Sequence, residues 1–151
     1  MLALVFQVGR AHYALESRHV VEVLPLVDVT PVPRAPAAVA GVFSYHGSPV
    51  PAIDLSRLMT DRPARRWLST RLVVVRYPRP AGDPRLLGLI AEHMTETERL
   101  DRFRFEPSGV TTAEAPYLGS VAVDDRGLVQ AIDLALLLPP PVEDVLFNDA
   151  G

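Results

Sequence analysis

Residues 41–58 read GVFSYHGSPVPAIDLSRL, and this stretch decides the fold. Strand-like residues at 41–45 are followed by a glycine turn at Gly47–Ser48 and a return strand over 50–53. Asp54 then stands in the position of a helix N-cap, ahead of regularly spaced leucines. The stretch therefore predicts a β-hairpin that leads directly into a short, aspartate-capped helix.

Part of this stretch occurs twice. The four residues Ala-Ile-Asp-Leu at 52–55 return at 131–134, which places Asp133 79 residues after Asp54. Gly41 has a counterpart 78 residues later in Gly119. Each copy reads as strand, glycine turn, strand, aspartate cap and short apolar helix. We therefore expect two related lobes, each of about half the chain.

The rest of the chain is patterned mainly as short strands. Alternating or continuous apolar residues predict further strands over 2–8, 11–15, 72–75, 86–91, 117–123 and 128–132. A weak helix is expected over 17–24, and Pro49 and Pro51 favour a sheet edge for their strand. Residues 92–116 are poorly patterned. The fold class is thus mainly β, with one or two small barrels and short helices.

The composition excludes several classes of chemistry. The chain has 151 residues, one domain's worth, and contains no cysteine, and all 15 basic residues are arginine. Disulfides, thiolate catalysis, lysine Schiff bases and the P-loop lysine are therefore impossible. A net charge of −3 argues against a nucleic-acid partner. No apolar run reaches the ~18 residues of a membrane span and the first residues do not resemble a signal peptide, so a cytoplasmic protein without membrane insertion is expected.

No catalytic or metal-binding motif stands out. The four histidines, at positions 12, 19, 46 and 93, lack the spacings of metal sites, and no phosphate-binding glycine loop is present. Asp54 and Asp133 are explained as helix caps. The sequence therefore predicts a binding module with no catalytic residue, no metal and no cofactor.

The chain resembles the CheW-type coupling proteins of bacterial chemotaxis-like signalling. The strongest match is 41–58, where that family reads roughly G-V-I-N-L-R-G-x-V-V-P-V-I-D-L-R-x-L. Residues 4–9, 13–15, 20–24, 72–75, 88–90, 117–119 and 132–134 also fit, so the resemblance covers nearly the whole chain.

The resemblance implies a particular organisation. The fold of the CheW-type family has two small SH3-like β-barrels packed with pseudo-symmetry. The resemblance implies that residues 1–151 form a single CheW-like domain of this kind. We expect lobe one at about 13–66, lobe two at about 1–12 together with 67–138, and a C-terminal tail at 139–151.

The resemblance also implies a function and partners. Such proteins are non-catalytic adaptors that join the cytoplasmic tip of a methyl-accepting chemotaxis receptor to the regulatory domain of a CheA-type histidine kinase. They are cytoplasmic and are recruited to membrane receptor arrays. By position, the receptor-binding groove would be formed by Val20, Glu22, Gly41, Tyr45, His46 and Gly47. The resemblance assigns no residues to the kinase interface.

The chain departs from the family in this groove. His46 replaces the usual arginine before the turn glycine, and Ser44–Tyr45 replaces an Asn–Leu pair. A titratable ring in place of a guanidinium changes what the groove can bind. The pattern is similar to couplers of surface-sensing (biofilm) pathways that feed a diguanylate cyclase response regulator.

Other interpretations remain open at this stage. A small ligand-binding or hydrolytic protein could use a cleft with His46 and Asp54, if the two side chains come within hydrogen-bond reach. A nucleic-acid-binding barrel could use Arg62, Arg65, Arg66 and Arg71. A free-standing kinase regulatory lobe is a further alternative.

Overall fold

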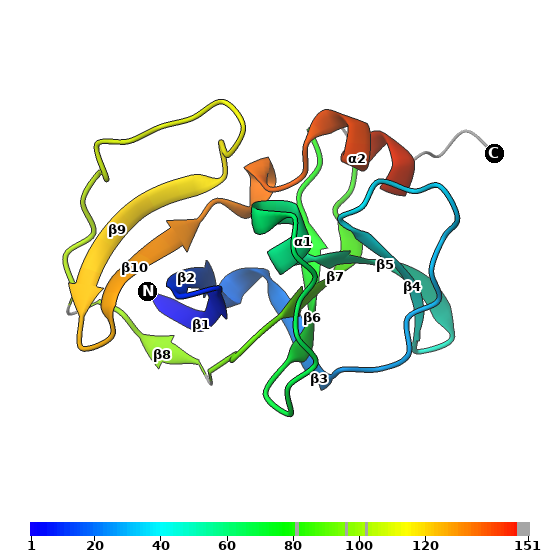
Figure 1. Cartoon of the computed structure of the whole chain (residues 1–151), viewed down its shortest axis with the longest axis horizontal. Coiled ribbons are helices and arrows are strands. Elements are labelled where there is room, and N and C mark those ends of the chain that lie inside the picture. The colour runs from blue at the N-terminus through cyan, green and yellow to red at the C-terminus, as the bar shows by residue number, and fades with distance from the viewer. Residues whose placement is uncertain (81, 96, 102, 148–151) are drawn as a thin grey trace.

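Two five-stranded sheets lie side by side, with a short helix between them (Figure 1). The structure is a computed structural model that describes residues 1–80, 82–95, 97–101 and 103–147. The first sheet has the strand order β8-β1-β2-β10-β9, and the second has the order β3-β6-β7-β5-β4. The mainly β prediction is confirmed.

The first sheet consists of β8 (Glu98–Arg99), β1 (Leu2–Val8), β2 (Ala11–Glu16), β10 (Gly127–Ile132) and β9 (Leu118–Asp124). The second consists of β3 (Val20–Pro25), β6 (Arg71–Tyr77), β7 (Arg85–Ala91), β5 (Ser48–Asp54) and β4 (Val39–Tyr45). The helical elements are η1 (Ser17–His19), α1 (Leu55–Thr60), η2 (Leu134–Leu136) and α2 (Pro140–Leu146).

The two sheets repeat one construction. The hairpin β4–β5 leads into α1, and the hairpin β9–β10 leads into η2. Asp54 caps α1 by accepting from the Arg57 backbone N–H at 3.2 Å, and Asp133 caps η2 by accepting from Ala135 N–H, also at 3.2 Å. Strands β5 and β10 each add a parallel neighbour, β7 and β2 respectively. The duplication predicted from the two Ala-Ile-Asp-Leu segments is therefore real in three dimensions.

The backbone pairing defines the register of the repeat. An isolated bridge joins Thr30 to Val42 in the second sheet, and a matching bridge joins Glu106 to Val121 in the first. Val42 and Val121 are thus equivalent, 79 residues apart. In this register Ser120, not Gly119, occupies the position of Gly41, so the glycine pair proposed from the sequence is displaced by one residue.

The sheets divide the chain differently from the predicted lobes. Strands β6 and β7 were expected in lobe two, but they pair with β3 and β5 in the sheet that spans residues 20–91. Strand β2 joins β1 and β10 in the other sheet. The amino-terminal hairpin thus completes the carboxy-terminal unit, but the boundaries fall near 17 and 92. Strand partners are long-range choices that no local pattern in the sequence specifies.

One apolar core joins the two sheets. Its members include Phe6 and Leu15 from the first sheet and Ile53, Val73 and Val75 from the second, all 2% exposed or less. Strand β6 is buried on both faces, because Leu72 to Val75 are fully buried. This confirms the interpretation of that continuous apolar run.

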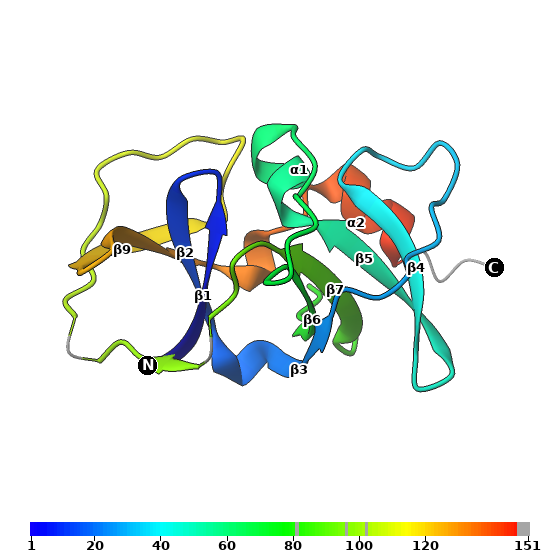
Figure 2. The same cartoon turned by 60° about the horizontal axis from the view of Figure 1, so that its bottom comes forward.

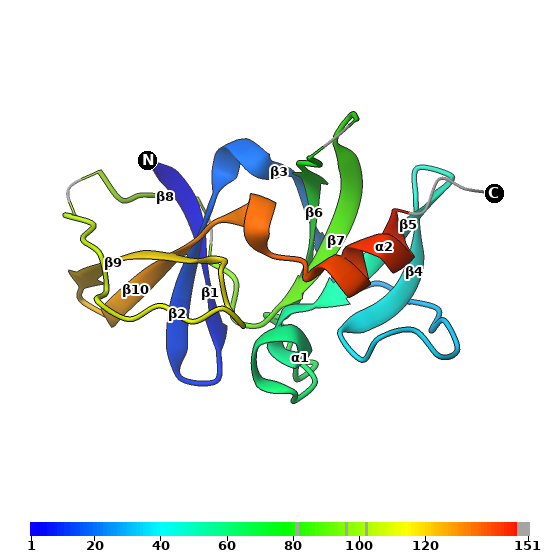
Figure 3. The same ribbon diagram turned by 90° about the horizontal axis from the view of Figure 1, so that it is seen from above.

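Much of the predicted carboxy-terminal tail, 139–151, is folded, and residues 148–151 of it lie outside the described residues. Residues 140–146 form α2, which lies over the second sheet (Figure 3). Val142 and Phe147 are buried, and the Phe147 ring stacks on Tyr77 with centroids 5.7 Å apart. The helix begins with Pro140 and Pro141, because proline is tolerated in the first turn of a helix.

Two local predictions are wrong. Residues 17–24 form the short η1 and then β3, because valine-rich segments fit a pleated strand better than a helix. Strand β5 lies between β4 and β7 and is not an edge strand. The prolines are tolerated because β5 pairs with β7 only from Ala52 onward, so Pro49 and Pro51 have β4 as their one neighbour.

Candidate binding site at the β4–β5 hairpin

The hairpin tip is a two-residue turn made by His46 and Gly47. Their φ angles are +50° and +81°, and Tyr45 pairs with Ser48 across the turn. Two consecutive positive φ values are typical of the type I′ turn, which matches the twist of paired strands. The turn is therefore one residue earlier than the Gly47–Ser48 turn expected from the sequence.

Three of the predicted groove residues meet at this tip. The Tyr45 hydroxyl donates to Glu22 Oε1 at 2.7 Å, and His46 Nε2 lies 3.7 Å from the same oxygen. The rings of Tyr45 and His46 meet edge to face, with centroids 4.4 Å apart. We call Glu22, Tyr45 and His46 the hairpin patch. It presents a carboxylate, a phenol and an imidazole on an exposed surface.

The carboxylate alters the chemistry of its neighbour. The hydrogen bond to Glu22 raises the pKa of the Tyr45 phenol, since losing the phenolic proton would place two negative charges side by side. Tyr45 therefore stays neutral and acts as a donor. The hairpin patch can offer a partner both an acceptor and an aromatic face.

The hairpin patch also joins the two outer strands of its sheet. Glu22 lies on β3 and Tyr45 ends β4, and these strands stand at opposite ends of the strand order. The first sheet has the same arrangement. There Glu98 of β8 accepts from both terminal nitrogens of Arg126, at 2.7 and 3.0 Å, and Arg126 lies in the β9–β10 turn. Part of the role of Glu22 and Tyr45 is thus to close the sheet.

Two further predicted residues lie elsewhere. Val20 is half-buried on β3 and packs against the shared apolar core. Gly41 is buried under the preceding segment, where a Cβ atom would lie 2.0 Å from the Thr30 carbonyl oxygen. Gly47 is exposed in the turn itself. The structure therefore brings Glu22, Tyr45, His46 and Gly47 together at the tip and places Val20 and Gly41 in structural positions.

The site with His46 and Asp54 does not exist. His46 precedes β5 and Asp54 ends it, so the length of the strand, about 20 Å, separates them. Asp54 is also occupied, because it accepts from the backbone N–H groups of Arg57 and Ala64. Both residues belong to one sequence motif, but the extended strand between them keeps them far apart in space.

Among the residues that the structure describes, no group of three or more histidine, aspartate or glutamate side chains could hold a metal ion. None of the helices in that part of the chain is long and apolar enough to span a membrane.

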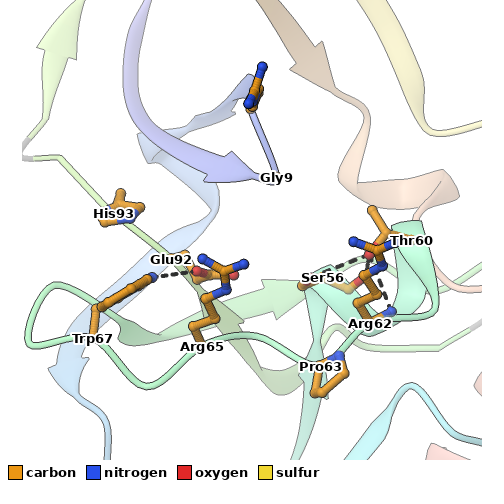
Figure 4. Close-up of a pocket in the computed structure, with 10 residues that line it drawn as sticks. Gly9, Ser56, Thr60, Arg62, Pro63, Arg65, Trp67, Glu92 and His93 are labelled. Atoms are coloured by element: carbon orange, nitrogen blue, oxygen red, sulfur yellow. Dashed lines mark hydrogen bonds between the residues drawn. The ribbon is translucent and has the colours of Figure 1, made fainter.

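The sequence interpretation missed one polar feature. Arg62 and Arg65, which the sequence offered for a nucleic-acid-binding alternative, and His93, which lacks the spacing of a metal ligand, line one recess beside α1 (Figure 4). The run of arginines next to Trp67 was the available signal.

Comparison with known proteins identifies the fold family. The model of the CheW-like domain matches residues 2–140. The chain belongs to the CheW-like domain family. Members of this family are non-catalytic scaffolds, which confirms the prediction that the protein is not an enzyme.

Two individual proteins are similar to parts of this chain. Protein FrzA of Myxococcus xanthus is 38% identical over 69 residues, which cover 46% of this chain and 43% of FrzA. The chemotaxis protein CheW of Treponema pallidum (strain Nichols) is 36% identical over 52 residues, covering 34% of this chain and 31% of that protein. The matches thus span less than half the length of either relative.

A solved structure shows the same fold over nearly the whole chain. The scaffolding protein TtCheW from Thermoanaerobacter tengcongensis superposes with a TM-score of 0.76 at 22% identity, covering 93% of this chain and 89% of that one. The predicted pair of SH3-like barrels with pseudo-symmetry is confirmed for this CheW-like domain.

Proposed function

We propose that this chain is a cytoplasmic, non-catalytic adaptor that couples methyl-accepting chemoreceptors to a CheA-type histidine kinase. The observation that carries the proposal is the hairpin patch. Three groove residues expected from the family resemblance lie in contact on an exposed tip of a CheW-like fold. The names of the relatives, a chemotaxis protein and a scaffolding protein, support the same role.

The mechanism follows from holding two partners at once. The receptor tip contacts the hairpin patch, with Gly47 allowing close approach because it has no side chain. The kinase regulatory domain contacts a separate surface. Coupling requires that at least one of these contacts differ between the active and inactive states of the kinase. In this proposal, binding to the receptor recruits the chain to receptor arrays at the membrane.

The finer proposal concerns the pathway. The place that an arginine holds in the family is taken by His46, which interacts with Glu22 through a single nearby nitrogen rather than a two-pronged guanidinium. A receptor surface that is complementary to a hairpin patch with histidine differs from one that is complementary to a patch with arginine at the same position. We propose that the cognate receptor belongs to a surface-sensing pathway.

The test is capture of partners from a lysate of the source bacterium, with the purified chain as bait. A methyl-accepting receptor and a histidine kinase are expected, and the response regulator that accompanies the kinase names the pathway. Recovery of neither by a folded bait would contradict the adaptor role.

A variant tests the hairpin patch. His46→Asp places a second carboxylate beside Glu22, so repulsion should lower the affinity for a receptor signalling fragment by about tenfold or more. Thr111→Asp, which adds the same charge in an exposed loop of the other unit, is the matched control and should bind normally. Unchanged binding by folded His46→Asp would remove the hairpin patch from the receptor interface.

A further inference from the structure

A recess of about 760 Å³ lies where the two units of the fold meet. Its walls include the β1–β2 turn at Gly9–Arg10, one side of α1, and the residues Glu92 and His93 that follow β7. The loop after α1 contributes Arg62, Pro63, Arg65 and Trp67. Figure 4 shows this arrangement, and Figure 2 shows α1 standing between the sheets. We call it the arginine recess. Its volume lies within the range of small-molecule sites, about 300–1,000 Å³.

Three guanidinium groups line the arginine recess, from Arg10, Arg62 and Arg65. Within the part of the chain that the structure describes, none of the three has a carboxylate partner. Glu92 is the one acidic residue among the described lining residues, and it accepts from Trp67 Nε1 at 2.7 Å. Three guanidinium groups and one carboxylate thus give the recess a positive balance, although the whole chain has a net charge of −3.

The walls are held in place before any ligand arrives. The buried Thr70 hydroxyl donates to the Arg65 carbonyl at 2.6 Å and accepts from the Trp67 backbone N–H at 3.1 Å. Glu92, which binds Trp67 of this loop, is in turn tied to β1 by the bond from Gln7 N–H to the Glu92 carbonyl, at 3.0 Å. Because the backbone of this wall is fixed from both units, binding would cost little backbone ordering.

An aromatic surface adjoins the charges. The Trp67 and His93 rings stack with centroids 5.8 Å apart, and the Arg65 guanidinium lies 5.6 Å from the Trp67 ring centroid. Trp67 retains 45% exposure. A flat organic group can pack beside these rings while its anionic end meets the arginines.

We propose that the arginine recess binds a small phosphate-bearing ligand whose phosphate groups are contacted by Arg10, Arg62 and Arg65. Guanidinium groups present paired N–H donors that match the oxygens of phosphate, and each contact adds charge-assisted hydrogen bonds. This site is separate from the hairpin patch, because α1 and His46 lie at opposite ends of β5. The proposal does not depend on the receptor or the kinase.

Trp67 provides the readout, since it is the single tryptophan of the chain. The purified full chain would be titrated at low salt with inorganic phosphate, pyrophosphate and ADP, followed by Trp67 fluorescence and by calorimetry. We expect saturable binding of at least one of these probes. A stronger response to ADP than to pyrophosphate, which has the same number of phosphates, would show that the organic part contributes, and equal responses would show that phosphate alone is recognised.

Charge-neutral variants locate the binding. Arg10→Gln and Arg62→Gln should each weaken binding by about tenfold or more, because each removes a charge-assisted hydrogen bond to phosphate. Arg66→Gln is the matched control. It removes the same charge next to Arg65, from an exposed residue that does not line the recess. Circular dichroism would verify that all three variants are folded.

Several results would overturn the proposal. They are the absence of saturable binding to all three probes, an equal response to sodium chloride at the same ionic strength, and equal weakening by Arg66→Gln and Arg62→Gln. Binding of a poly-glutamate peptide, but of none of the phosphate compounds, would overturn it in favour of an acidic protein segment.

Discussion

Gly41 shows how a single residue can serve the fold where the sequence suggested a binding role. Its φ is +144°, and a Cβ atom there would lie 2.0 Å from the carbonyl oxygen and 2.6 Å from the carbonyl carbon of Thr30. Two backbone hydrogen bonds of 2.9 Å between Thr30 and Val42 hold the segments together. Any side chain at position 41 would have to break this bridge.

We therefore predict that Gly41→Ala destabilises the protein by about 3 kcal/mol or more, in the range reserved for disrupted cores and strained backbones. Urea unfolding monitored by circular dichroism measures the loss. Gly47→Ala is the control, because Gly47 also has a positive φ but a Cβ there would meet nothing within 4 Å. It should cost only about 1–2 kcal/mol. A stable Gly41→Ala protein that fails to bind receptor would instead return Gly41 to the interface.

At the scale of single residues, the family pattern predicts four groove residues at the hairpin tip: Glu22, Tyr45, His46 and Gly47. In the structure the first three contact one another there. Val20 and Gly41 belong to the same pattern, but their packing partners lie in the shared core and at Thr30. Only the folded chain shows which patterned residues face solvent and which face a neighbouring segment.

Among the elements, β8 is the shortest strand and is fixed by a charge network. Arg126 in the β9–β10 turn donates to Glu98 on β8 and to Asp124 Oδ2, the latter at 2.5 Å. The hydrogen bonds from Arg126 lower the pKa of the Glu98 carboxyl. For Asp124, burial acts to raise the pKa, but the hydrogen bonds from Arg126 outweigh it and the net shift is downward.

These shifts predict a pH dependence of stability. Both carboxyls have a lower pKa in the folded chain than in the unfolded chain, where Glu98 and Asp124 have ordinary values of 4.5 and 3.8. Their stabilising effect is therefore complete above about pH 5 and is lost as the pH falls through the lower folded values. Arg126→Gln should remove about 1 kcal/mol at pH 7, since water screens the partly exposed pair, and less at pH 3.

Chemical denaturation at pH 7 and pH 3 measures this difference. Arg104→Gln is the matched control, because the Arg104 side chain is 88% exposed and pairs with Glu106, which is also exposed. It should change stability by less than about 0.5 kcal/mol at either pH. An equal loss for Arg126→Gln at both values would show that packing, not charge, ties β8 to the turn.

Prediction from sequence succeeded for elements whose signal is local. Hairpins with glycine turns and helices capped by Asp54 and Asp133 carry their signal within a few residues, and all of these are present. Which strands pair is decided by contacts between distant segments, so the expected lobe bounds differ from the bounds of the two sheets. The helix α2 was missed because it begins with prolines, which stop a helix everywhere except in its first turn.

At the scale of the whole molecule, the two units share one core. Phe6 of β1 is 2% exposed and belongs to the same cluster as Ile53 and Val75 of the second sheet. Helix α2 follows the first unit in the chain, yet it covers the second (Figure 3). Separating the units would therefore expose apolar surface on both, and we expect the chain to unfold in a single cooperative step.

This expectation leads to a prediction about distant sites. Phe6→Ala should destabilise the protein by about 3–5 kcal/mol, because it leaves a cavity in the shared core. Although Phe6 lies in the first sheet, the loss should appear in full in the fluorescence of Trp67, which follows α1 of the second unit. Far-UV circular dichroism reports on all strands and should give the same midpoint. Val123→Ala, at a side chain of the first sheet that is 71% exposed, should change either midpoint little.

If Phe6→Ala lowered the circular dichroism midpoint but left the Trp67 transition in place, the units would be independent. The arginine recess between them would then be a mobile cleft rather than a preformed site.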